Sequence, residues 1–136
     1  MTNPEIKHWQ TIHDMMRGYR AAQILLTANQ LDIFRHLAGA PRRAAELAAL
    51  TGSHPEALRR LLNAAAGLGL LTKQDDLYAN SPLAAACLTE DGSFFLGNMA
   101  RLEQAGYERW GRLPEAIRSG RWPEPNRQME ERTNWV

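Results

Sequence analysis

The apolar residues in the first part of the chain recur with the period of an α-helix. Between Pro4 and Leu26 they fall at positions i, i+3, i+4, i+7, i+10 and i+14, as Ile12, Met15, Met16, Tyr19, Ala22 and Leu26. A helix of that length spans about 30 Å, the width of a small domain. Because it is apolar on more than one face, we expect a partner subunit to bury it.

The next segments have the pattern of short helices separated by tight turns. We predict helices over residues 29–39, 43–51 and 55–68, which end near Gly39, Gly52 and Gly67-Leu68-Gly69. The third helix opens at Pro55, whose missing N–H costs nothing at the first helical position. The buried faces expected for the three helices are, in order, Leu31, Ile33, Phe34 and Leu37; Ala44, Leu47, Ala48 and Leu50; and Leu58, Leu61, Leu62, Ala65 and Leu68.

After these helices the pattern changes to that of a β-hairpin. Leu70–Lys73 and Leu77–Asn80 are two short candidate strands around the polar turn Gln74–Asp76. A helix, a tight turn, a second helix and a hairpin together make a winged helix. Helical periodicity returns after Ser81-Pro82. It places Phe95, Met99, Leu102 and Gly106 on one face and Trp110, Leu113 and Ile117 on another, with a fresh turn starting at Pro114.

The predicted fold class is therefore mainly α: a winged helix-turn-helix with a short β-hairpin wing and additional N- and C-terminal dimerisation helices. At 136 residues, 44% of them hydrophobic, the chain has the size and composition of one soluble domain. No apolar run reaches the roughly 18 residues that a membrane span needs, and no signal peptide is recognisable at the N-terminus. The single cysteine, Cys87, is expected to be a small buried hydrophobe and favours a cytoplasmic location.

A set of short motifs follows one another through most of the chain. They are Ala21–Leu26 with Leu31-Asp32-Ile33-Phe34, Ala45–Ala48 with Thr51-Gly52, Pro55–Leu62 with Leu68–Leu71, then Tyr78, Ser81–Ala84 and Trp110–Leu113 with Gly120. In this order and spacing they resemble the dimerisation domain of the small-molecule S-adenosylmethionine (SAM)-dependent O-methyltransferases. In that family a Thr or Ser often stands at Arg43 and an Asp at His54. Each lost cap would weaken its helix start by about 1 kcal/mol.

The resemblance implies a division of the chain. Residues 1–120 would form the winged-helix dimerisation domain, and residues 121–136 a linker and the start of a helix leading to a C-terminal methyltransferase domain that this chain lacks. In that family the C-terminal domain holds the glycine-rich SAM loop and the histidine that removes the hydroxyl proton. Here Gly67-Leu68-Gly69 follows a helix rather than a strand, which is typical of a helix stop. The histidines, at positions 8, 13, 36 and 54, have no metal-site spacing. We assign no catalytic, cofactor-binding or metal-binding residue to this chain.

The resemblance also implies a function for the complete protein, which would be a homodimer that uses SAM to methylate a hydroxyl of an aromatic or polyketide-like small molecule. The first helix would cross to the partner, and the helix with Met99 would lie near the substrate. By position, the candidate pocket residues are Met15, Met16, Tyr19, Met99 and Trp110. Methionines suit an adaptable apolar pocket and aromatic rings a planar ligand. The alternative for each of them is plain core packing.

Two other function classes are compatible with the predicted fold. A winged-helix DNA-binding regulator would use the helix 55–68 for recognition, but Glu56 accompanies Arg59 and Arg60 there, and Asp75-Asp76 at the wing tip would repel phosphates. The net charge of +1 is also far from that of a dedicated nucleic-acid binder. The second alternative is a stand-alone dimeric binding or adaptor protein. Sequencing the gene beyond Val136 would distinguish this alternative from a methyltransferase.

Overall fold

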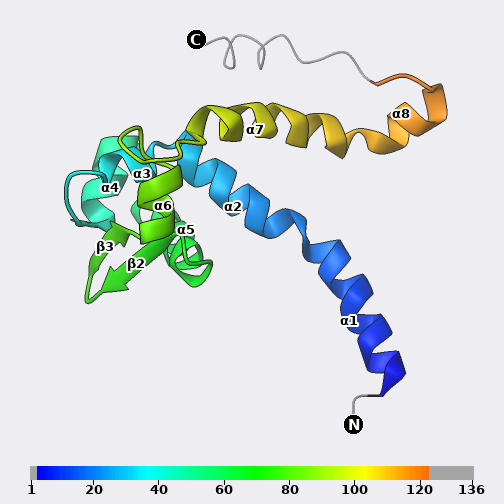
Figure 1. Ribbon diagram of the computed structural model, residues 1–136, viewed down its shortest axis with the longest axis horizontal. Helices are drawn as coiled ribbons and strands as arrows, with labels where there is room; N and C mark the ends of the chain where they lie inside the picture. Colours follow the sequence, from blue (N-terminus) through cyan, green and yellow to red (C-terminus); the bar gives the residue numbers. More distant parts are fainter. Residues whose placement is uncertain (1–2, 123–136) are drawn as a thin grey trace.

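The apolar stripe at the start of the chain forms two helices rather than the single predicted one. The computed structural model describes residues 3–122. In it, helix α1 (Pro4–Arg17) and helix α2 (Tyr19–Gln30) are separated only by Gly18, whose backbone stays in the right-handed helical region (φ −57°, ψ −27°). Helix α2 therefore continues in roughly the direction of α1, and the two form a long arm (Figure 1). The side chain of Asn3 starts the arm by accepting a hydrogen bond from the N–H of Glu5.

The middle of the chain forms the predicted winged helix. Its elements are helices α3 (Ile33–His36), α4 (Ala44–Thr51) and α5 (Pro55–Gly67) and strands β1 (Arg42–Arg43), β2 (Leu71–Gln74) and β3 (Leu77–Asn80). The strands form an antiparallel sheet in the order β1-β3-β2, in which Leu71 pairs with Asn80 and Gln74 with Leu77. The hairpin wing is confirmed. Strand β1 was not predicted, because two arginines carry no apolar alternation.

Several local predictions are wrong for identifiable reasons. The helix expected over residues 29–39 is split, because Asp32 takes a left-handed conformation (φ 58°) between α2 and α3, and α3 ends at His36, before Gly39. Leu50 is 49% exposed because it lies beside, and not on, the buried stripe of α4. Leu68 is 45% exposed because it caps the end of α5 instead of belonging to its inner face.

Of the two helix starts expected to be weak, the one at His54 has a side-chain cap, whereas the one at Arg43 has no side-chain acceptor for its first turn. At α5 the ring nitrogen Nδ1 of His54 accepts a hydrogen bond from the N–H of Ala57 at 3.2 Å. At α4 the carboxylate of Glu46 reaches back and accepts the N–H of Arg43 at 3.3 Å. Each bond satisfies a backbone donor that has no partner inside a helix.

The hydrophobic core lies between α2 and the elements of the winged helix. Tyr78 is its largest fully buried side chain, and its hydroxyl donates a hydrogen bond to the side-chain oxygen of Asn63. Cys87 packs against this core like a small hydrophobic residue, as predicted, but it is half-buried rather than fully buried. The buried core residues are Ala28, Ile33, Phe34, Leu37, Leu47, Ala48, Leu58, Leu62, Ala65, Leu70, Leu71, Tyr78, Ala84 and Leu88.

In the last described part of the chain, helix α7 (Gly97–Gly111) packs against α2, and the chain then extends away from the winged helix. Helix α6 (Pro82–Cys87) is followed by a loop, helix α7 and helix α8 (Leu113–Ser119), so that α7 and α8 form a second arm (Figure 1). Pro114 lies in the first turn of α8, as predicted, whereas Phe95 lies in the loop and not on a helix. The helix start predicted within residues 126–136 falls outside the described residues. No helix among residues 3–122 is long and apolar enough to cross a membrane.

Candidate dimerisation surface and apolar groove

Helix α1 has no buried residue, although one broad face of it is apolar. Ile6, Trp9, Ile12, Met15 and Met16 are all exposed there, and Tyr19 continues the face onto α2. Figure 1 shows the reason: α1 extends beyond the winged helix, with no other described element beside it. Exposed apolar patches of this extent are characteristic of interaction surfaces.

A second uncovered apolar surface lies where α7 packs against α2. There, the structure contains an open groove of about 400 Å³. Glu103 is the one charged residue lining it within the described chain, and the hydroxyl of Tyr107 donates a hydrogen bond to the backbone oxygen of Tyr19 at 3.3 Å. The lining residues are Ala22, Leu25 and Leu26 of α2, Leu88 and Leu96 of the loop before α7, and Met99, Ala100, Glu103, Gly106, Tyr107 and Trp110 of α7.

The structure places the five predicted pocket residues at two locations. Met99 and Trp110 line the groove, and Tyr19 lies beside it through its contact with Tyr107. Met15 and Met16 lie on α1 and do not line the groove. The side chains of all five are more than half exposed, so none of them belongs to the core of this subunit.

Sequence reasoning missed several residues that line the groove. Tyr107 could have been found, because it lies eight positions after Met99 and therefore on the same face of α7. Leu88 and Leu96 carry no comparable signal, because they come from an irregular loop.

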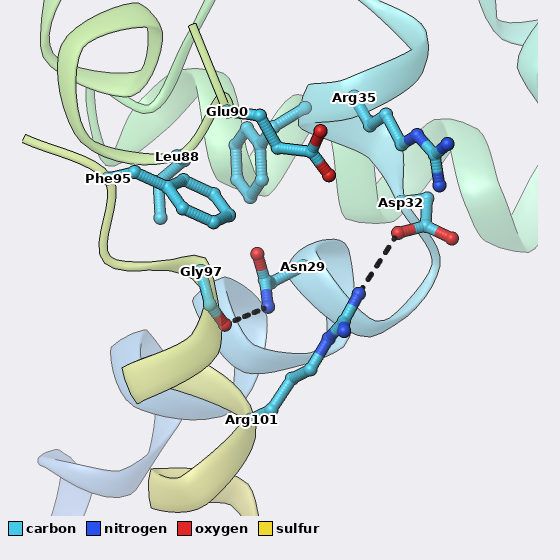
Figure 2. A pocket seen from close by; sticks show the side chains of 9 residues that line it. Asn29, Asp32, Arg35, Leu88, Glu90, Phe95, Gly97 and Arg101 are labelled. Carbon is cyan, nitrogen blue, oxygen red and sulfur yellow. Dashed lines mark hydrogen bonds and ion pairs between the residues drawn. The ribbon is translucent and has the colours of Figure 1, made fainter. Parts of the chain in front are cut away.

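A small polar pocket fixes the position of α7 relative to α2. At its centre, the side-chain nitrogen of Asn29 donates a hydrogen bond to the backbone oxygen of Gly97 at 3.2 Å (Figure 2). Next to it, Arg101 pairs with Asp32 at 3.8 Å, and both side chains are partly exposed. The pocket has a volume of about 30 Å³, which suits a water molecule and not a metabolite. We therefore interpret it as a structural joint between the two helices.

We expect Asn29→Ala to destabilise the fold by about 1–3 kcal/mol, because it leaves the carbonyl of Gly97 without its buried donor. Arg101→Ala, the control, removes only an exposed ion pair and should cost less than about 1 kcal/mol. Urea unfolding followed by circular dichroism measures both changes. Equal losses of stability for the two variants would contradict this role for Asn29.

The exposed face of α5 carries paired rather than free charges. Glu56 accepts two hydrogen bonds from Arg59, at 3.0 and 2.6 Å, and lies 3.7 Å from Arg60. The hydrogen-bonded guanidinium of Arg59 lowers the pKa of the Glu56 carboxyl below its ordinary value. At the wing, Asp76 lies 3.9 Å from Arg43. Acidic side chains therefore accompany the arginines both on α5 and at the wing.

Comparisons with known proteins agree with this architecture. The family model of the O-methyltransferase dimerisation domain matches residues 13–90. The tetracenomycin polyketide synthesis 8-O-methyl transferase TcmO of Streptomyces glaucescens is 36% identical over 111 residues, which are 80% of this chain and 33% of that protein. The acetylserotonin O-methyltransferase of Mus musculus is 36% identical over 123 residues, 85% of this chain and 32% of that protein.

Solved structures give the same result. The crystal structure of human N-acetylserotonin methyltransferase in complex with SAM matches with a TM-score of 0.74 and 27% identity, over 89% of this chain and 37% of that one. The mitomycin 7-O-methyltransferase MmcR matches with a TM-score of 0.73 and 31% identity, over 85% and 35%. The chain thus spans about a third of the length of these relatives. It belongs to the O-methyltransferase dimerisation domain family.

Proposed function

We propose that this chain is the dimerisation and substrate-pocket-lining part of a cytoplasmic SAM-dependent O-methyltransferase that methylates a hydroxyl of an aromatic or polyketide-like small molecule. The observation that carries the proposal is helix α1, fourteen residues long with an apolar face and no buried residue. Membership of the dimerisation domain family and the activities named for the relatives support it.

The pairing that we propose places α1 of each copy in the groove between α2 and α7 of the other. Both surfaces are apolar and uncovered in the single chain. Their lengths also agree, since α1 has 14 residues and α7 has 15, about 21 and 22 Å at the rise of an α-helix. In a pair with twofold symmetry each contact is made twice, which leaves no open end for further copies.

The same pairing suggests a role for the predicted pocket residues. Met99 and Trp110 line the groove of one copy, while Met15 and Met16 would approach it on α1 of the other. A flexible thioether beside an aromatic ring forms an adaptable wall for a planar apolar ligand. We propose these four residues, with Tyr19, as the contribution of this domain to the substrate pocket.

The residues of this chain do not fit a SAM site of the doubly wound type. Gly67 and Gly69 lie at the end of helix α5, and the strands described in residues 3–122 pair only in antiparallel fashion. A glycine-rich nucleotide loop follows a parallel strand and opens a helix. We therefore propose that SAM is held by another part of the enzyme.

Light scattering across a range of concentrations tests the pairing. The 15.3-kDa chain is expected to have twice its own mass at tens of micromolar. A mass of a single chain at those concentrations would contradict the proposal. The activity is tested separately on the product of the complete gene, by following transfer of labelled methyl groups from SAM to a panel of hydroxylated aromatic compounds. No transfer to any compound would contradict the proposed reaction.

A further inference from the structure

His13 has an unusual position on the apolar face of α1. Its ring stacks on that of Trp9, with 4.6 Å between the centroids and 15° between the planes. It is half-buried, whereas every other residue of α1 is exposed. Because His13 lies four positions after Trp9 and three before Met16, it shares their face of the helix. A residue that can change its charge near neutral pH is thus built into the surface that we propose for pairing.

We propose that His13 makes the pairing of two copies dependent on pH, with the pair stable when His13 is neutral and weakened when it is protonated. This inference rests on the proposed function, because it requires α1 to be covered by a second copy. A neutral imidazole can remain among apolar side chains, whereas an imidazolium loses its hydration there without a compensating partner. The stacking of His13 on Trp9 is already present in the single chain, so it does not by itself favour the pair over single copies.

Few charged groups lie near His13. On its own helix, Asp14 is adjacent and Arg17 lies one turn further on. No other described element lies beside α1 (Figure 1). In the groove proposed to receive α1, Glu103 is the one charged lining residue of the described chain. Direct pairing of Glu103 with protonated His13 would reverse the pH dependence, so the experiment must vary both residues.

The direction and size of the effect follow from proton linkage. Histidine side chains in water change charge near pH 6.5. If single copies can bind a proton at His13 and pairs cannot, the pair is favoured at higher pH and progressively lost as the pH falls. A pair contains two copies of His13. The dissociation constant should therefore rise by up to about 100-fold between pH 7.5 and pH 5.5.

The test measures the dissociation constant of the pair by sedimentation equilibrium at pH 7.5 and 5.5, with circular dichroism to check that the helices persist. We expect up to about 100-fold weakening at pH 5.5 in the natural chain, less than about 5-fold in His13→Gln, and unchanged pH dependence in the control His8→Gln. Glu103→Gln alters the groove itself, so it is a second control for the direction of the effect only: pairing should still weaken at pH 5.5. The inference would be overturned if the copies paired as tightly at pH 5.5 as at pH 7.5, or more tightly, or if the helices were lost at pH 5.5. It would also be overturned if the weakening persisted in His13→Gln or disappeared in either control. Pairing that is equal at both pH values would leave the proposed function intact, whereas absence of pairing at pH 7.5 would remove both.

Discussion

Ile12→Glu is expected to raise the dissociation constant of the pair at least 100-fold and leave single folded chains at micromolar concentration. Ile12 lies within the apolar face of α1 and is 56% exposed in the single chain. In the pair, the introduced carboxylate would lose its hydration, at a cost of at least about 1.4 kcal/mol. The twofold pair contains the substitution twice, and about 2.8 kcal/mol corresponds to a 100-fold change in affinity.

Gln10→Glu is the matched control for this prediction. It introduces the same side chain on the same helix, but two positions away, which is nearly the opposite face. Light scattering over a dilution series should give the mass of the pair for Gln10→Glu and that of one chain for Ile12→Glu. Because α1 buries no side chain within its own subunit, circular dichroism should show that both variants remain folded. If Ile12→Glu pairs as tightly as the natural chain, this face of α1 is not the dimer interface.

The sequence predicted the winged helix well because its elements are short and strongly patterned. Helix α5 has a proline at its start and leucines at helical spacing, and the hairpin has a polar tip between two short strands that each begin with a leucine. The errors occur where a backbone conformation decides the outcome. Asp32 adopts a left-handed conformation that no apolar period reveals, and Gly18 interrupts a helix whose apolar stripe continues through it.

The helix caps illustrate a different reason for error. A missing Ser, Thr or Asp at a helix start indicated an unsatisfied backbone group at Arg43 and at His54. In the structure, the imidazole of His54 caps α5, whereas at α4 the carboxylate of Glu46 accepts only the N–H of Arg43 itself and no side chain caps the first turn. Residue preferences describe the most frequent acceptor, whereas the physical requirement is only that some acceptor lies within reach.

The groove could be predicted only in part, because it joins segments that are distant in the chain. The family resemblance identified Met99 and Trp110, although helical spacing had placed them on different faces, and nothing in the sequence indicates that α7 packs against α2 about 70 residues earlier. That packing includes contacts between residues far apart in the chain, such as the hydrogen bond from Asn29 to Gly97. The apolar period thus indicates which face of a helix is buried or paired, and not which surface covers it.

Phe34→Ala should cause the largest loss of folding stability, about 3–5 kcal/mol, because it removes a large side chain that is 1% exposed and leaves a cavity in the core. Domains are commonly stable by only about 5–15 kcal/mol. The hydrogen bond from the Asn80 side chain to the backbone oxygen of Phe34, at 2.9 Å, does not involve the removed ring. The loss therefore reports on packing alone.

Phe94→Ala makes the same chemical change at a position that is 72% exposed, and should alter stability by no more than about 0.5 kcal/mol. Both variants are compared with the natural chain by urea unfolding at one protein concentration, since pairing adds stability that depends on concentration. Similar losses for the two phenylalanines would mean that Phe34 is not in the folding core. A large loss confined to Phe34→Ala would separate the two uses of apolar residues in this chain: burial at Phe34 holds the subunit together, while the exposed face of α1 remains for a partner.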